Sequence, residues 1–324
     1  LAAMRTFRKL LGDDLSMGLY SGNIQDIDCD FLFATVQTIS KEEHFNLFDS
    51  DHFDYVVIDE SHRAGAASYR RIIDYFEPKF MLGMTATPER TDGLDIFSLF
   101  DHNIAYEIRL NKALEEEMVS PFHYYGVADL TVNGVVVDDV IEFNYLTVKE
   151  RVDRIIEKTR LYGCDSGDIR GLVFCSRTEE ANFLSLEFNK RGLRTVSLTG
   201  DSSEADRLEA IDRLESECKN ERLDYIFTVD IFNEGVDIPR VNQIVMLRPT
   251  QSAIIFVQQI GRGLRKHTDK DYLTVIDFIG NYQNNYLVPV ALYGDNSYNK
   301  DVLRKLITSG SQFIPGCSTV NFER

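Results

Sequence analysis

The sequence lacks three features that would each assign it to a class of protein. It has no basic excess, since 52 Asp and Glu against 35 Lys and Arg give a net charge of −17. A phosphate backbone is held by electropositive surface, so any groove for DNA or RNA must be local. The five cysteines include no Cys-x-x-Cys pair, which argues against a zinc site or a disulfide framework and favours a reducing cytoplasm. No apolar run approaches the length of a membrane span.

The length of 324 residues is long for one core and suits two domains, at roughly 100–200 residues per domain. The contents of 44% hydrophobic and 27% charged residues are ordinary for a globular protein. The chain begins with Leu1 inside a predicted helix at 1–11. We therefore expect it to be a fragment of a longer protein.

Two adjacent carboxylates follow a short β-branched segment. The run Tyr55-Val-Val-Ile58 is predicted to be a buried strand of a parallel sheet, and Asp59 and Glu60 come directly after it, before Ser61 and His62. In open α/β sheets, ligands bind beyond the carboxyl ends of the strands. One carboxylate there can hold Mg²⁺ while the other takes a proton from water. Acidic pairs after strands also cap helices, so this pattern alone leaves both interpretations open.

Similar apolar runs recur along the chain with helical patterns between them. Buried strands are predicted at 31–36, 80–84, 171–175, 194–198, 225–229, 243–247 and 272–276, with 272–276 as the last. Strands alternating with helices over both halves predict two α/β domains with mainly parallel sheets.

Polar segments after these strands resemble, in order, the motifs of superfamily-2 DExH-box helicases and translocases. Asp59-Glu-Ser-His62 resembles the DExH box itself, and Thr85-Ala-Thr-Pro88 resembles motif III. Asp230 to Asp237 resembles motif V, and Gln258-Gln-Ile-Gly-Arg-Gly-Leu-Arg265 resembles motif VI. Weaker similarities to motifs Ib, IV and IVa are found at 35–39, 171–177 and 198–200. The set is most similar to the branch of restriction (ResIII) subunits and DNA-repair translocases.

The resemblance implies ATP bound with Mg²⁺ between two RecA-like domains, and DNA more than RNA as the partner. The implied catalytic residues are Asp59, Glu60, His62, Gln258, Arg262 and Arg265, with Asp59 as the Mg²⁺ ligand. The implied nucleotide-binding residues are Gly235 and Asp237. The implied nucleic-acid or coupling residues are Thr35, Gln37, Thr38, Thr85, Thr87, Ser176, Thr199 and Gly200. We expect Asp59 and Arg265 to face each other across the gap between the domains, and His62 to contact Gln258 and the motif III segment.

Three details accompany the motifs of the second half. Arg262 and Arg265 lie three apart, so on a helix they would share a face and could meet a γ-phosphate; a basic helix end stabilised by the macrodipole is the alternative. Ser176 is expected to open a helix in a capping box with Glu179. Relatives often have Thr where this chain has Val229, which weakens a specific hydroxyl contact there.

The phosphate-binding motif of the family, Gly-x-x-x-x-Gly-Lys-[Ser/Thr], occurs nowhere in the sequence. Without its backbone amides and Lys, the best phosphate ligands are absent. We therefore expect this chain to hydrolyse ATP negligibly and its intact parent to do so when DNA stimulates it. The alternatives are a non-catalytic scaffold that grips a strand, and a metal-dependent nuclease, for which no cluster of acids is visible.

The expected domains are a truncated RecA-like domain over 1–119, a second RecA-like domain over 120–290 and a C-terminal extension over 291–324. Further domains of the parent are expected on both sides.

Overall fold

The computed structural model describes residues 2–22, 24–85, 96–128, 149–229, 231, 238–248, 253–279 and 318–322. The chain divides into two compact units, Leu1–Glu107 and Ile108–Arg324. The limits of 1–119, 120–290 and 291–324 stay a prediction. Within the described ranges, no helix combines the length and the apolar character needed to cross a membrane.

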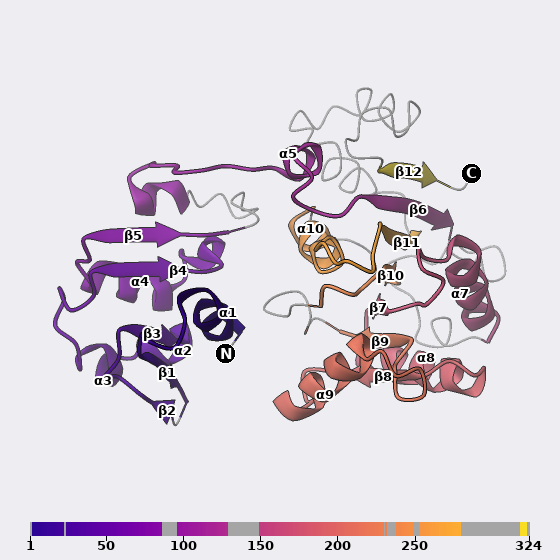
Figure 1. The fold of residues 1–324 in the computed structure, drawn as a ribbon, viewed down its shortest axis with the longest axis horizontal. Helices are drawn as coiled ribbons and strands as arrows, with labels where there is room; N and C mark the ends of the chain where they lie inside the picture. The colour runs from indigo at the N-terminus through magenta and orange to yellow at the C-terminus, as the bar shows by residue number, and fades with distance from the viewer. Residues whose placement is uncertain are drawn as a thin grey trace. The chain divides into compact units, whose positions relative to one another are not determined.

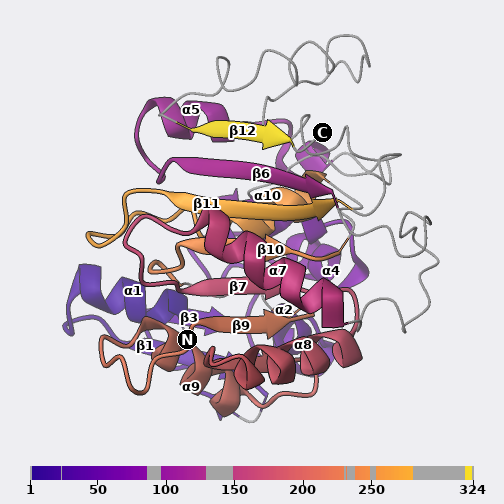
Figure 2. The same ribbon diagram turned by 90° about the vertical axis from the view of Figure 1, so that its right-hand side faces the viewer.

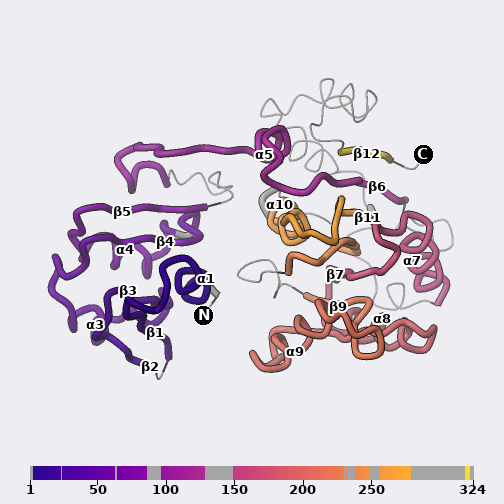
Figure 3. Tube along the Cα trace, in the orientation of Figure 1, coloured from indigo at the N-terminus to yellow at the C-terminus, as the bar shows by residue number. Residues whose placement is uncertain are grey.

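The first unit begins with a helix and a small sheet (Figure 3). Its elements here are α1 (Ala2–Leu11), β1 (Met17–Ser21), β2 (Ile24–Gln25), β3 (Phe31–Ala34), α2 (Val36–Ile39) and α3 (Glu42–Phe45). Helix α1 ends at Gly12, which has φ +80° and whose N–H donates to the Arg8 carbonyl, as expected of a C-terminal glycine. The sheet order is β2-β1-β3, with β1 parallel to β3.

A second pair of strands in this unit positions the predicted acids. Its elements are β4 (Tyr55–Ile58), the 3₁₀ turn η1 (Ser61–Arg63), α4 (Ala67–Tyr75), β5 (Phe80–Gly83) and the 3₁₀ turn η2 (Ile96–Phe100). The strand prediction is confirmed, and β4 pairs with β5 in parallel. The expectation that both faces are buried is wrong, because Tyr55 and Val57 are 71% and 54% exposed. Only the opposite face, with Ile58, is covered by described residues.

The second unit is built around one large parallel sheet. Its elements are α5 (Leu110–Glu115), β6 (Phe122–Ala128), α7 (Lys149–Tyr162), β7 (Gly171–Phe174), α8 (Thr178–Lys190), β8 (Thr195–Leu198), α9 (Glu204–Glu215), β9 (Tyr225–Thr228), β10 (Gln243–Met246), α10 (Ala253–Gly261), β11 (Leu273–Ile279) and β12 (Thr319–Phe322). The strand order is β12-β6-β11-β10-β7-β9-β8, and each described pairing is parallel (Figure 2).

Helices cover both faces of this sheet, because successive side chains of a strand point to opposite sides. Leu172 and Phe174 of β7 pack in one core with α5, α9 and α10. Val173 and Cys175 pack in the other core with α7 and α8. Figure 1 shows α10 on one side of the strands of this unit and α7 on the other. The predicted α/β class with a mainly parallel sheet is confirmed for this unit.

The prediction that 272–276 is the last strand is wrong. Strand β12 follows it in sequence and pairs with β6, which the sequence pattern also did not predict. His123 Nδ1 lies 2.8 Å from Thr319 Oγ1 across this pair. Neither strand is a continuous apolar run, since β6 carries His123 and β12 carries Asn321. Continuous apolar runs therefore did not predict either strand.

One carboxyl group is buried inside the sheet. Asp277 of β11 is 5% exposed, and the Tyr124 hydroxyl of β6 donates to its Oδ2 at 2.7 Å. Burial raises the pKa of Asp277 from 3.8 to about 7, against the opposing effect of the Tyr124 hydrogen bond. The folded protein therefore keeps a proton on this carboxyl group that the unfolded chain loses near pH 4.

Replacing Asp277 by Asn is expected to stabilise the fold increasingly as pH rises. Below pH 4 both states of the wild type hold the proton, and between the two pKa values only the folded state does, so wild-type stability falls until about pH 7 and then levels off. The difference between the two pKa values corresponds to a loss of about 4 kcal/mol in the free energy of unfolding of the wild type. Urea unfolding of both proteins from pH 4 to 8 measures it, with exposed Asp201→Asn as the control. A difference that does not change with pH would contradict the expectation.

Candidate active site

The carboxyl ends of β4 and β5 bring the predicted acids next to Thr85. Ile58 is opposite Gly83 in the parallel register, and backbone bonds continue past both strands. Met84 N–H donates to the Ile58 carbonyl at 2.9 Å, and Ser61 N–H donates to the Met84 carbonyl at 2.8 Å. The turn after β4 and the residues after β5 therefore form one connected structure.

Three side chains meet in this turn. His62 Nδ1 lies 3.3 Å from Glu60 Oε2 and 3.1 Å from Thr85 Oγ1. The Glu60 side chain is 27% exposed and that of His62 is 14% exposed, and the Glu60 Oε2 atom that faces His62 is itself buried. The predicted contact between His62 and the motif III segment is observed. The predicted contact between His62 and Gln258 would join the two units and stays a prediction.

Glu60 has an unusual backbone conformation, with φ 51° and ψ 45°. A non-glycine residue in this left-handed region carries strain of about 1–2 kcal/mol. The sequence contained no glycine that would have signalled this conformation. Asp59 supports the turn because its Oδ1 accepts the Glu60 N–H at 3.0 Å.

Asp59 is a suitable ligand for a magnesium ion that arrives with a nucleotide. It is exposed at the end of β4. Mg²⁺ keeps several waters and is held by one or two carboxylates together with substrate phosphates, which fits a single exposed carboxylate. Across the described part of the chain, no group of three or more His, Cys, Asp or Glu side chains could hold a metal ion.

The predicted nucleic-acid contacts of the first unit differ in their exposure. Thr35 and Gln37 are exposed at the start of α2, whereas Thr38 is 8% exposed. The Thr38 hydroxyl lies 2.9 Å from the Thr35 hydroxyl and accepts the Gly22 N–H at 3.3 Å. Thr38 therefore supports the loop from inside, and Thr35 and Gln37 are the accessible members of the group.

In the second unit, the predicted contacts lie at one edge of the sheet. Phe174, Thr228 and Leu198 are in register at the ends of β7, β9 and β8. Ser176 therefore follows β7 at the same edge where Thr199 and Gly200 follow β8. Ser176 and Gly200 are exposed. Parallel pairing thus brings together residues that are far apart in the sequence.

The predicted capping box of Ser176 and Glu179 is not formed. Helix α8 begins at Thr178, and its N-cap residue makes no side-chain capping bond. The Ser176 N–H instead donates to Glu180 Oε2 at 2.9 Å. Glu180 lies one residue further along the helix and faces the interior, which explains why it replaces Glu179.

A buried ion pair that the sequence analysis did not identify holds Glu180 in this position. Arg151 Nη1 of α7 donates to Glu180 Oε1 at 2.7 Å, and both side chains are almost fully buried. Each charge lies four residues before a buried apolar residue of its helix, Ile155 and Leu184 respectively. A charged residue on the apolar face of each helix was the feature of the sequence that could have predicted this ion pair.

The two arginines of the motif VI segment do not share a helix face. Helix α10 ends at Gly261, so Arg262 lies in the following turn and Arg265 is exposed beyond it. At Gly263, a Cβ atom would lie 2.4 Å from the Leu273 side chain. Any larger residue at this position would have to displace the buried Leu273 side chain.

Four predicted site residues remain, and only Gln258 lies within the described ranges. Gln258 of α10 is 8% exposed, and its Nε2 makes no hydrogen bond to any residue in the described ranges. Thr87, Gly235 and Asp237 lie outside the described residues. Their roles stay predictions.

Comparison with known proteins finds a matching family model in each half of the chain. Residues 2–90 match the model for the Type III restriction enzyme, res subunit, and residues 150–267 match the helicase conserved C-terminal domain. The IRC3 protein of Saccharomyces cerevisiae, whose name describes a candidate ATP-dependent helicase, is 30% identical over 296 residues, 86% of this chain and 42% of that protein. The EcoAI type I restriction endonuclease subunit of Escherichia coli is 26% identical over 302 residues, 81% of this chain and 36% of its own. This chain spans less than half the length of either relative.

Solved structures share the fold. A fragment of a candidate HsdR subunit of a type I restriction enzyme from Vibrio vulnificus has a TM-score of 0.65 at 21% identity, over 97% of this chain and 58% of that chain. Dbp5 of Saccharomyces cerevisiae, solved with RNA and ADP BeF3, has a TM-score of 0.61 at 14% identity, over 90% and 71%. The predicted RecA-like α/β fold is confirmed.

Proposed function

Because the chain belongs to the superfamily-2 helicases, with a res-subunit domain followed by a helicase C-terminal domain, we propose that it belongs to an ATP-dependent motor that moves along DNA. The observation that carries the proposal is the side-chain group at the ends of β4 and β5. There a turn places Glu60 against His62, and His62 against Thr85.

Each residue of this group has a separate task in the proposed reaction. Asp59 would hold Mg²⁺, which supplies positive charge to the β- and γ-phosphates when the nucleotide is bound. Glu60, whose side chain is 27% exposed, takes a proton from the attacking water. His62 fixes the Glu60 carboxylate and links it to Thr85. Arg262 and Arg265 stabilise the charge that develops on the transferred phosphoryl group.

DNA is the proposed partner. Two of the relatives are named as subunits of restriction enzymes, and the res-subunit model covers the first unit. Thr35 and Gln37 in the first unit, and Ser176 and Gly200 in the second, are exposed groups that can contact a sugar-phosphate backbone. The net charge of −17 confines such contacts to local surfaces.

ATP hydrolysis by the intact parent protein is expected to rise when double-stranded DNA is added, while this chain alone is expected to be inactive. The reason is that the sequence carries the catalytic acids and arginines but no Gly-x-x-x-x-Gly-Lys-[Ser/Thr] motif. Release of inorganic phosphate from both proteins, with DNA, with RNA and with neither, measures this.

The outcomes separate the alternatives. Stimulation by RNA but not by DNA would overturn the choice of partner. A parent that binds DNA but never hydrolyses ATP would favour the non-catalytic scaffold. Turnover by this chain at the parent's rate would show that the phosphate-binding motif is dispensable and would contradict the expectation directly.

A further inference from the structure

The loop between Arg262 and Arg265 is held at three consecutive carbonyl groups. The Gly263 carbonyl accepts from Lys270 Nζ at 2.9 Å. The Leu264 carbonyl accepts from the Ser120 N–H at 2.7 Å, and the Arg265 carbonyl accepts from Ser120 Oγ at 3.1 Å. Every carbonyl from Gly263 to Arg265 is therefore bonded to a group from outside the loop.

Both groups that hold the loop are buried. Ser120 is 2% exposed and Lys270 is 7% exposed. A buried ammonium group is costly unless its donors are satisfied. Lys270 Nζ satisfies them on carbonyl groups, since it also donates to Pro239 at 2.6 Å and to Val241 at 3.0 Å. Lys270 thereby connects the arginine loop to the end of the motif V segment.

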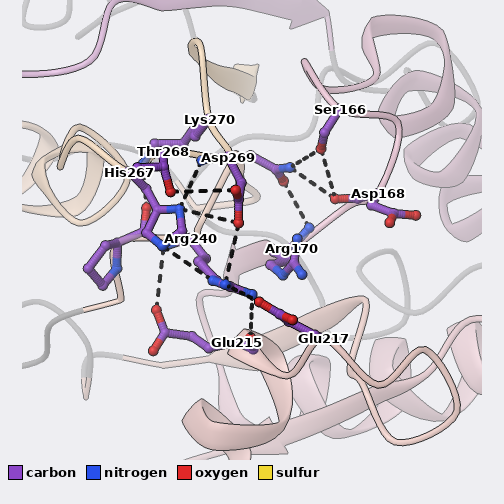
Figure 4. Close-up of polar contacts among 12 residues, drawn as sticks. Ser166, Asp168, Arg170, Glu215, Glu217, Arg240, His267, Thr268, Asp269 and Lys270 are labelled. Atoms are coloured by element: carbon purple, nitrogen blue, oxygen red, sulfur yellow. Dashed lines mark hydrogen bonds and ion pairs between the residues drawn. The ribbon is translucent and has the colours of Figure 1, made fainter.

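The turn that carries Lys270 is itself anchored by Arg240, the residue between Pro239 and Val241. Arg240 Nη2 lies 2.7 Å from Glu217 Oε1 and 3.3 Å from Asp269 Oδ2, and its Nε donates to His267 Nε2 at 3.3 Å (Figure 4). The backbone on either side of Arg240 accepts from Lys270, and the side chain of Arg240 holds the turn before Lys270. This arrangement leaves Lys270 little freedom to move.

We propose that Lys270 and Ser120 are positioning residues for nucleotide hydrolysis, because they fix the backbone of the loop from which Arg262 and Arg265 extend. The inference rests on the proposed function of the two arginines. An arginine helps the reaction only if its guanidinium group is already in place when charge develops. Beyond Gly261, where α10 ends, backbone bonds to α10 hold only the N–H groups of Arg262, Gly263 and Leu264, and the contacts of Lys270 and Ser120 hold the carbonyl side of the loop as far as Arg265.

The test is the steady-state ATPase activity of the intact parent protein with saturating DNA. Lys270→Met is expected to lower kcat by about 10- to 100-fold, as a displacement of a catalytic group near 1 Å would, with the KM for ATP unchanged. Ser120→Ala keeps the N–H contact and loses only the hydroxyl contact, so a loss of about fivefold is expected. Lys270→Arg, which keeps a cationic donor, is expected to recover part of the activity, and exposed Lys149→Met is the control.

A triple variant separates positioning from a general effect on folding. If Lys270 acts through the arginines, Lys270→Met causes no further loss in a protein that already carries Arg262→Ala and Arg265→Ala. Melting temperatures are measured throughout, and Ser120→Ala and Lys270→Arg decide the question if Lys270→Met does not fold. Full turnover by a folded Lys270→Met protein, when Arg262→Ala alone is impaired, would overturn the inference. Full turnover by the Arg262→Ala, Arg265→Ala protein would instead overturn the proposed function.

Discussion

Replacing Glu60 by Gln in the intact parent protein is expected to lower ATP turnover by about a thousandfold and to leave ATP binding unchanged. The estimate follows from the 10²- to 10⁴-fold contribution of a general base. The amide keeps the shape of the carboxylate and a hydrogen-bond acceptor for His62, but it cannot take a proton from water. Phosphate release measures turnover, and titration calorimetry with a non-hydrolysable ATP analogue measures binding.

The matched control is Glu42→Gln, at an exposed glutamate in the first turn of α3 in the same unit. Its turnover should equal that of the wild type. Loss of both binding and turnover in Glu60→Gln would indicate a structural role, which is a serious alternative because Glu60 occupies a strained turn. Unchanged turnover would mean that another group takes the proton.

The sequence was sufficient for those parts of the site that depend on local pattern. The strand at 55–58 and the one beginning at Phe80 are apolar runs, and each is followed directly by its functional residues. Parallel pairing then places the segments after the two strands side by side. The contact between His62 and Thr85, which are 23 residues apart, could therefore be expected from the sequence.

Features that depend on distant packing could not be predicted in this way. Helical spacing placed Arg262 and Arg265 on one face, but α10 ends at Gly261, and Gly263 then packs close to the Leu273 side chain of the sheet. The capping pattern selected Glu179, but burial against Arg151 selects Glu180. In each case, a contact between segments far apart in the chain overrides a local preference.

Replacing Arg262 by Ala in the parent protein is expected to lower kcat by about a thousandfold, at the lower end of the effect of an arginine finger. Arg262→Lys is expected to recover little, because an ammonium group lacks the planar fork that bonds two phosphoryl oxygens. Arg265→Ala tests the second guanidinium group in the same way. The control is Arg160→Ala, at an exposed arginine on α7 of the same unit. Wild-type turnover in both Arg262→Ala and Arg265→Ala would leave a basic helix end as the better interpretation of this segment.

Combining Glu60→Gln with Arg262→Ala tests whether the acids of the first unit and the arginines of the second serve one reaction. Groups that act together in a single chemical step give strongly non-additive losses. The ATP turnover of the double variant is therefore expected to be only slightly lower than that of the less active single variant. If the losses multiply instead, Glu60 and Arg262 contribute independently of one another, which contradicts their joint action in a single step.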